Sequence, residues 1–258
     1  MIERMFERLA ARGETALIAY LPAGFPTLPE SMELLKTVAA SGADLIELGV
    51  PYCDPVADGP TIQQATQRAL DGGTTLRGIL DALDDRAAGG TSAVPISLMS
   101  YLNPLLAFGR EALLVRMATA GCCGLIVPDL PLEEAGVWID QTTAHGIALS
   151  LLVAPTSSPE RSREIAHRSR GFVYYVSVTG ITGAREALPD DLFSSLARIK
   201  EITTLPVAVG FGISTPAQVR LLRGRADAVV VGSRIVRAIQ DGEDVAKLIR
   251  ALKAATRS

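Results

Sequence analysis

Eight short runs of apolar and β-branched residues recur along the chain, and a helical segment follows each of them. The eight predicted strands cover residues 16–21, 44–50, 95–100, 124–127, 148–153, 172–176, 206–209 and 228–231. Such alternation indicates an α/β fold in which helices cover a parallel sheet. Eight units in 258 residues is the count of a (β/α)8 barrel, and we expect residues 1–258 to form a single barrel domain.

Helices are predicted between these strands from apolar spacings of three and four residues and from capping signals. They begin near residues 27, 61, 75, 110, 132, 158, 189, 214, 233 and 244. Before the first strand, apolar residues at helical spacing from Ile2 to Leu9 predict one more helix. The expected barrel therefore has an extra N-terminal helix and extra helices in its βα loops.

A doubly wound open sheet is the alternative architecture. It often carries a dinucleotide-binding fingerprint of three glycines directly after the first strand. Here no glycine-rich turn follows the first strand, and the motif Gly210-Phe-Gly212 lacks the third glycine. These absences favour the barrel.

Composition narrows the classes of function. The net charge is −3, no run of Lys or Arg suggests a nucleic-acid or membrane surface, and no apolar run is long enough to span a bilayer. The first eight residues mix acids into an amphipathic pattern unlike a signal peptide. Three cysteines without a C-x-x-C pair fit a reducing compartment. We therefore expect a cytoplasmic protein that acts on a small molecule.

A carboxylate lies in the middle of the second predicted strand. Because side chains alternate across a strand, Ile46, Leu48 and Val50 share an apolar face, while Glu47 and Gly49 lie on the other. Burying a carboxylate costs several kcal/mol unless it is paired or functional. Asp54 and Asp58 follow in the next loop, so proton chemistry is one interpretation. In the other, Glu47 pairs with a buried Arg and the two Asp residues only shape turns.

Other catalytic groups are scarce. The four Lys residues all fall within predicted helices, which argues against a Schiff base at a strand end. The only histidines, His145 and His167, lie near helix ends, which argues against a Ser-His-Asp triad or a histidine metal site, and we expect no metal. Cys122 and Cys123 are expected just before the fourth strand, as core residues.

Carboxylates, phenols and glycines remain at the predicted strand ends. The acids are Glu47, Asp54, Asp58 and Asp129, and the phenols are Tyr20, Tyr101 and Tyr174 or Tyr175. This set fits general acid–base catalysis without a cofactor. The segments from Tyr101 to Pro104 and from Asp129 to Pro131 could equally be plain turns.

Glycines follow three consecutive predicted strands. They lie in Gly180-Ile-Thr-Gly183, Gly210-Phe-Gly212 and Gly232-Ser233. Barrels often bind phosphate through the loops after strands seven and eight and the N-terminus of a short helix, where backbone N–H groups suffice. The glycines therefore predict a phosphorylated substrate.

Several of these segments together resemble one known family. The segment Glu47-Leu-Gly-Val-Pro-x-x-Asp-Pro-x-Ala-Asp58-Gly-Pro-Thr-Ile-Gln is similar to the signature of the tryptophan synthase alpha chain. Further matches follow in the expected order: Tyr101-x-Asn-Pro, Pro128-Asp129-Leu-Pro-x-Glu-Glu, Tyr175-Val-Ser-Val-Thr-Gly-Ile-Thr-Gly183, Gly210-Phe-Gly-Ile-Ser and Gly232-Ser233. The resemblance covers almost the whole chain.

The resemblance implies a cofactor-free retro-aldol lyase of tryptophan biosynthesis that cleaves indole-3-glycerol phosphate to indole and glyceraldehyde 3-phosphate. It implies catalytic roles for Glu47, Asp58 and Tyr174, with Glu47 as the acid–base group and Asp58 on the indole N–H. The substrate-binding positions that it implies are Tyr20, Met99, Asp129, Thr182, Gly183, Phe211, Gly212, Gly232 and Ser233. Of these, Thr182 and Gly183 would lie on a loop that closes over the site. We further expect a raised pKa for Glu47.

The resemblance also implies a partner, the beta chain, which carries pyridoxal phosphate and joins indole to serine in an alpha2-beta2 heterotetramer. Asp54, Asn103 and Pro104 would face it. Tyr52-Cys53 stands where many relatives have Phe-Ser. Three alternatives stay open: a lyase that works alone and releases indole, a mainly allosteric subunit for the beta chain, and another phosphosugar enzyme such as an isomerase.

Overall fold

The computed structural model describes residues 1–88, 94–176, 188, 191–210 and 212–257. In these residues it has nine strands: β1 (Ala16–Pro22), β2 (Leu45–Gly49), β3 (Ile96–Met99), β4 (Cys122–Ile126), β5 (Ala148–Ser150), β6 (Leu152–Val153), β7 (Val173–Val176), β8 (Val207–Gly210) and β9 (Ala228–Val231). All their pairings are parallel, and their order is β5-β4-β3-β2-β1-β9-β8-β7-β6.

The strands form a nearly closed barrel, which confirms the predicted fold class. β5 and β6 are two halves of the predicted strand 148–153, and they lie at opposite ends of the sheet order. The first half pairs with β4 and the second with β7, so this one segment closes the ring. Its interruption falls at Leu151, whose N–H donates to Ser169 Oγ at 3.2 Å instead of to a neighbouring strand.

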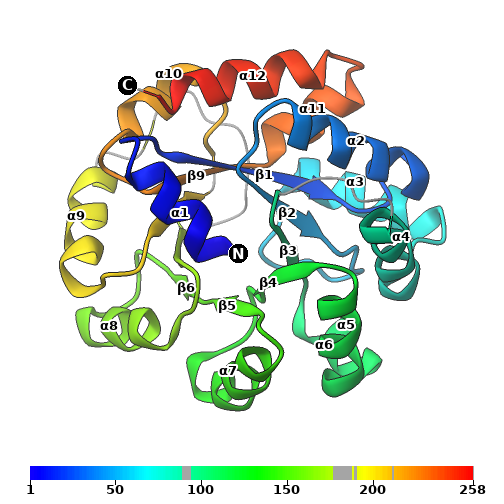
Figure 1. The fold of residues 1–258 in the computed structure, drawn as a ribbon, viewed down its shortest axis with the longest axis horizontal. Helices are drawn as coiled ribbons and strands as arrows, with labels where there is room; N and C mark the ends of the chain where they lie inside the picture. The colour runs from blue at the N-terminus through cyan, green and yellow to red at the C-terminus, as the bar shows by residue number, and fades with distance from the viewer. Residues whose placement is uncertain (89–93, 177–187, 189–190, 211, 258) are drawn as a thin grey trace.

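Helices surround the strands (Figure 1). In the described residues they are α1 (Ile2–Ala10), α2 (Leu28–Ala40), α3 (Pro60–Asp71), α4 (Leu76–Ala88), α5 (Leu102–Phe108), α6 (Arg110–Thr119), the 3-10 helix η1 (Leu132–Glu134), α7 (Ala135–Ala144), α8 (Pro159–Arg168), α9 (Leu192–Ile202), α10 (Pro216–Leu222), α11 (Ser233–Gln240) and α12 (Val245–Ala255). None of these helices is long and apolar enough to cross a membrane.

Capping explains where several helices begin. The side chain of Thr27 accepts the Glu30 N–H at the start of α2, and the side chain of Ser158 accepts the Arg161 N–H at the start of α8. Each cap satisfies a backbone donor that the first turn of a helix leaves unpaired. Both starts agree with the sequence prediction.

Two local predictions were wrong. The prediction has no helix at Leu102–Phe108, because Asn103 and Pro104 suggest a turn, but these residues form α5. Proline is tolerated there because it lies in the first turn of the helix. Cys122 and Cys123 do not precede the fourth strand but begin β4. The bounds of the other predicted elements in the described residues differ by a few residues.

The core has two layers, one on each side of the strands, and β2 contributes residues to both. Ile46, Leu48 and Val50 belong to the apolar layer between the strands and the helices, whereas Leu45 belongs to the barrel interior. The predicted alternation of faces is therefore confirmed, and Glu47 lies in the strand with 3% of its surface exposed. The same alternation places its side chain on the interior side with Leu45.

Helix α1 covers the N-terminal end of the barrel, where it crosses the ring of strands in Figure 1. Its apolar side chains, Ile2, Met5, Phe6 and Leu9, belong to the interior core. The rings of Phe6 and Phe172 lie 5.9 Å apart between centroids. The catalytic end of such a barrel is the opposite one, so α1 supports the site without forming it.

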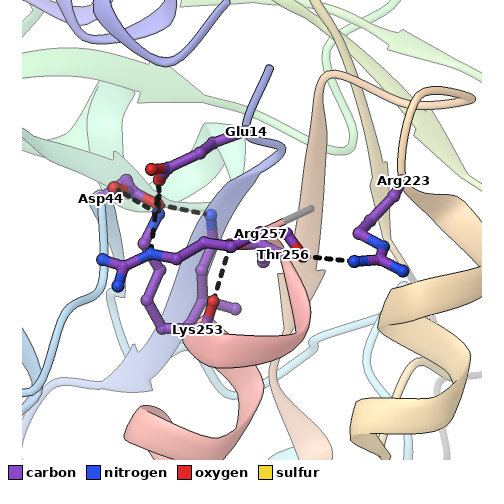
Figure 2. A network of polar contacts seen from close by, with 7 residues as sticks. Glu14, Asp44, Arg223, Lys253, Thr256 and Arg257 are labelled. Atoms are coloured by element: carbon purple, nitrogen blue, oxygen red, sulfur yellow. Dashed lines mark hydrogen bonds and ion pairs between the residues drawn. The ribbon is translucent and has the colours of Figure 1, made fainter. Parts of the chain in front are cut away.

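A partly buried ion network joins the C-terminal helix to the first two strands (Figure 2). Lys253 Nζ on α12 lies 2.8 Å from Asp44 Oδ2 and 3.2 Å from Glu14 Oε2. Asp44 Oδ2 also accepts the Leu17 N–H of β1 at 2.8 Å. The Lys253 side chain is only 7% exposed. This network fixes the last helix against the beginning of the barrel.

Candidate active site

Eight of the predicted site residues come together at the carboxyl ends of the strands. One cavity is lined by Tyr20, Glu47, Asp58, Ile62, Met99, Tyr174, Gly212, Val230, Gly232 and Ser233. These residues come from β1, β2, β3, β7 and β9, from the loops that follow β2, β8 and β9, and from the first turns of α3 and α11. In a parallel barrel this end is where side chains from different strands converge.

Glu47 is buried without full compensation for its charge. Its Oε2 has no hydrogen-bond partner among the described residues. Loss of water and, second, the charge of Asp58 raise the pKa of Glu47 to about 8. No Arg is among the buried residues that the structure describes, so the alternative of a buried Arg partner finds no support. Glu47 is thus a carboxyl group that can hold and release a proton near neutral pH.

Asp58 is the second buried carboxyl group, with 5% of its surface exposed. Burial raises its pKa to about 7, and a hydrogen bond from the Tyr101 hydroxyl acts in the opposite direction. A raised pKa was expected for Glu47 only, but two neighbouring buried carboxyl groups cannot both ionise easily. The pair therefore retains a proton at neutral pH more readily than exposed acids do.

Glycines make room for two tyrosines of the cavity. A Cβ atom on Gly49 would lie 2.3 Å from the Tyr20 hydroxyl oxygen, and one on Gly210 would lie 2.5 Å from the Tyr174 hydroxyl oxygen. The ring of Tyr20 therefore occupies the space that the missing side chain of Gly49 leaves beside Glu47. Burial raises the pKa values of both phenols well above their ordinary value, so both stay neutral donors.

Small residues line the end of the cavity near β8 and β9. Gly212 has a φ of +90°, a conformation that favours glycine. Gly232 precedes α11, and Ser233 is the first residue of that helix. The N-terminus of α11 thus meets the cavity, and a helix N-terminus favours an anion.

The remaining predicted residues lie at the rim or beyond the described residues. Asp129 is exposed and does not line the cavity; its Oδ1 accepts the Leu102 N–H at 2.8 Å. Asp54 and Asn103 are exposed and Pro104 is half-buried. Thr182, Gly183 and Phe211 lie outside the described residues.

Three residues of the site have no role in the prediction, although Tyr101 was among the candidate phenols. Ile62 and Val230 add apolar lining, and Tyr101 bonds to Asp58. Ile62 lies inside the long motif that follows Glu47, so the motif contained a signal for it. No sequence signal distinguishes Val230 from the other apolar residues of the predicted strands. Tyr101 was considered only as a phenol at a turn.

The described residues offer few groups for other chemistry. No group of three or more His, Cys, Asp or Glu side chains in them could hold a metal ion. His145 contacts Glu111 at 3.1 Å on the surface, and none of the three cysteines forms a disulfide. The carboxyl pair is therefore the reactive feature of the cavity.

Comparisons with known proteins agree with this geometry. A sequence model of the tryptophan synthase alpha chain family matches residues 6–257. The chain belongs to the tryptophan synthase alpha chain family. The alpha chain of Picosynechococcus is 47% identical over 242 residues, which cover 93% of this chain and 91% of that protein. The alpha chain of Geobacter sulfurreducens is 45% identical over 256 residues, covering 97% and 96%.

Solved structures of the family have the same fold. A chain of tryptophan synthase from Mycobacterium tuberculosis superposes with a TM-score of 0.92 at 38% identity, covering 100% of this chain and 98% of that one. The alpha subunit from Legionella pneumophila superposes with a TM-score of 0.89 at 31% identity, covering 99% and 97%. The family and its barrel, expected from the motifs, are confirmed.

Proposed function

We propose that Glu47 and Asp58 carry out the reaction of this family, the retro-aldol cleavage of indole-3-glycerol phosphate to indole and D-glyceraldehyde 3-phosphate. Family membership makes the chain a carbon–carbon lyase of tryptophan biosynthesis. The observation that carries the assignment of roles is the pair of buried carboxyl groups in one cavity, with one Glu47 oxygen free of hydrogen bonds in the described residues.

The proposed chemistry uses the two carboxyl groups differently. Protonated Glu47 donates its proton to indole C3, and the ring nitrogen takes up the positive charge, which the Asp58 carboxylate stabilises through the N–H. The glycerol hydroxyl then loses its proton to Glu47, an aldehyde forms, and the electrons of the broken carbon–carbon bond restore the indole ring. Glu47 ends as it began, so the step balances without a cofactor. Two carboxyl groups with separated proton affinities suit such a reaction.

The phosphate end of the substrate would lie at the glycine-lined part of the cavity. Gly212, Gly232 and Ser233 meet there, and the N-terminus of α11 favours a negative charge. Tyr174, Tyr20 and Met99 would border the indole ring. We keep Thr182, Gly183 and Phe211 as proposed substrate-binding residues, and Asp129 as a residue of the mouth.

A beta-chain partner is implied by the family, and we propose an alpha2-beta2 heterotetramer in the cytoplasm, with pyridoxal phosphate held only by the beta chain. Asp54 and Asn103 would belong to its contact surface. A hydrogen bond of 2.9 Å between the Tyr52 hydroxyl and Asn103 Nδ2 joins the loop after β2 to α5. The segment that leads to Asp54 is therefore joined to the helix that carries Asn103 and Pro104, which supports a common contact surface.

The test measures indole released from indole-3-glycerol phosphate by the purified chain, alone and with a tryptophan synthase beta chain. Glu47→Gln should lower kcat about 10²- to 10⁴-fold, because it removes the acid–base group and keeps the shape. Glu33→Gln, on the exposed face of α2, is the control and should match the parent.

Unchanged activity of Glu47→Gln would overturn the assignment. Full activity of the parent alone, unaffected by the beta chain, would favour a lyase that works by itself. No indole from the parent under any condition, together with stimulation of the beta chain, would favour a mainly allosteric subunit.

A further inference from the structure

The Tyr101 side chain is buried, with 2% of its surface exposed, between the end of β3 and the start of α5. Its hydroxyl oxygen accepts the Ala57 N–H at 3.0 Å, and its proton is donated to the Asp58 carboxylate. A phenol has one proton to donate, so this one is committed to Asp58. Both contacts hold the same short segment, which carries Asp58 into the cavity.

Tyr101 is itself fixed on several sides. Its ring packs against that of Tyr52 with centroids 5.3 Å apart and planes tilted by 32°. The next residue, Leu102, donates its N–H to Asp129 Oδ1 at 2.8 Å. The hydroxyl is therefore preorganised before any substrate arrives, so little ordering is required at the moment of reaction.

The hydrogen bond from Tyr101 affects which carboxyl group of the cavity is ionised, because Asp58 lies among other titratable groups. The titratable groups that influence the cavity are Glu47 on β2, Tyr20 on β1, Tyr174 on β7, Tyr101, and Asp129 beyond Tyr101. Burial favours the neutral form of both Glu47 and Asp58, so they compete for a proton. The bond from Tyr101 favours the charged form of Asp58.

We propose that Tyr101 is a positioning residue, whose hydroxyl bridges the Ala57 N–H and the Asp58 carboxylate so that Asp58 accepts the ring N–H of the substrate while Glu47 carries the proton. This inference rests on the proposed function. The phenol keeps its proton for Asp58, because burial and the nearby Asp58 raise the pKa of Tyr101 well above its ordinary value. Tyr101 thus favours the ionised form of Asp58, and the proton stays on Glu47.

The test is the pH dependence of kcat/KM for Tyr101→Phe, which keeps the ring and its packing on Tyr52. Hydrogen bonds to charged groups are strong enough that kcat should fall about 10- to 100-fold. Asp58 must be ionised to act, and without the bond its pKa rises. The acidic limb of the profile should therefore move to higher pH, by about one unit.

Tyr52→Phe is the matched control. It removes a hydroxyl from the other ring of the same pair, and that hydroxyl bonds to Asn103 and not to Asp58. The acidic limb should stay where it is in the parent. Far-UV circular dichroism and the thermal midpoint of each variant check that both remain folded.

The outcomes separate this inference from the proposed function. If Glu47→Gln and Asp58→Asn lose activity while Tyr101→Phe keeps the parent's kcat and acidic limb, the positioning role is overturned and the proposed function stands. If Tyr52→Phe moves the limb as far as Tyr101→Phe does, loss of local packing explains the effect and the inference fails. If Glu47→Gln and Asp58→Asn keep full activity, the proposed function itself fails.

Discussion

At the scale of single residues, the burial of Glu47 in the cavity costs the folded protein free energy. Glu47 gives up hydration and keeps an oxygen without a hydrogen bond in the described residues. Such a group destabilises the folded protein whenever it is ionised, because the unfolded chain solvates the charge better. The same burial suits a group that must bind and release a proton during a reaction.

The free energy of unfolding should show this cost as a function of pH. The pKa of Glu47 is about 8 in the folded protein against 4.5 for an unperturbed Glu, so the folded state binds its proton more tightly. The stability contributed by this protonation is complete below about pH 4.5 and is lost as the pH rises through about 8. At 1.36 kcal/mol per pKa unit the loss is up to about 5 kcal/mol.

Glu47→Gln, which cannot ionise, should therefore become more stable than the parent as the pH rises from 5 to 8, and the difference should level off above about pH 8. Urea unfolding at a series of pH values measures it. A difference that does not change with pH would show that Glu47 ionises as easily in the folded chain as in the unfolded one. Glu33→Gln, whose side chain is 70% exposed, is the control for the removal of one carboxyl group from the chain.

At the scale of elements, the two ends of the barrel have separate tasks. The carboxyl ends of the strands carry the cavity, and α1 fills the other end with apolar side chains from Ile2 to Leu9. An open barrel end would expose interior side chains to water. Helix α1 therefore contributes to stability and not to the chemistry.

Phe6→Ala should lower the free energy of unfolding by about 3–5 kcal/mol, because it leaves a cavity beside Phe172 in the interior core. In conditions where the variant stays folded, kcat should equal that of the parent. Arg4→Ala, on the exposed side of α1, should change stability by no more than about 0.5 kcal/mol. A large fall in kcat for folded Phe6→Ala would show that the two ends are coupled.

At the scale of the whole molecule, contacts between distant parts of the chain complete the barrel. Lys253 lies 209 residues from Asp44 in the sequence, and together with Glu14 they form the partly buried network of Figure 2. Arg223 on the neighbouring loop donates to the carbonyl oxygen of Arg257. The end of the chain is thus held against its first two strands.

Lys253→Met should lower the free energy of unfolding by about 1.5–3 kcal/mol at neutral pH, because it removes the buried cation that hydrogen-bonds to the half-buried carboxylates of Glu14 and Asp44. Loss of water acts to raise the pKa of Glu14, but the hydrogen bond and charge of Lys253, with the charges of Arg257 and Arg12, lower it overall. Part of this stability is therefore present above pH 4.5 and is lost as the pH falls through the folded value. The effect should therefore shrink at low pH. Lys36→Met breaks an exposed pair and should cost less than about 1 kcal/mol. Equal losses for the two variants in urea unfolding would contradict the assignment.

Much of this architecture could be predicted because its signals are local. The alternation around Glu47 fixes its face of β2, and Thr27 and Ser158 mark helix starts through their own side chains. The helix α5 and the break at Leu151 could not be found in this way. The first depends on Asp129 accepting the Leu102 N–H, and the second on Ser169 accepting the Leu151 N–H.

The barrel, the family and the two carboxyl groups follow from the order of residues alone, since strand alternation and a contiguous motif are local features of the chain. The proton affinities of the two carboxyl groups depend instead on contacts between distant segments. Ala57 and Tyr101 are 44 residues apart, yet folding places the Tyr101 hydroxyl against both Ala57 and Asp58. The pKa of a carboxyl group depends on its loss of water and on the donors and charges around it, and these are fixed only when the strands converge.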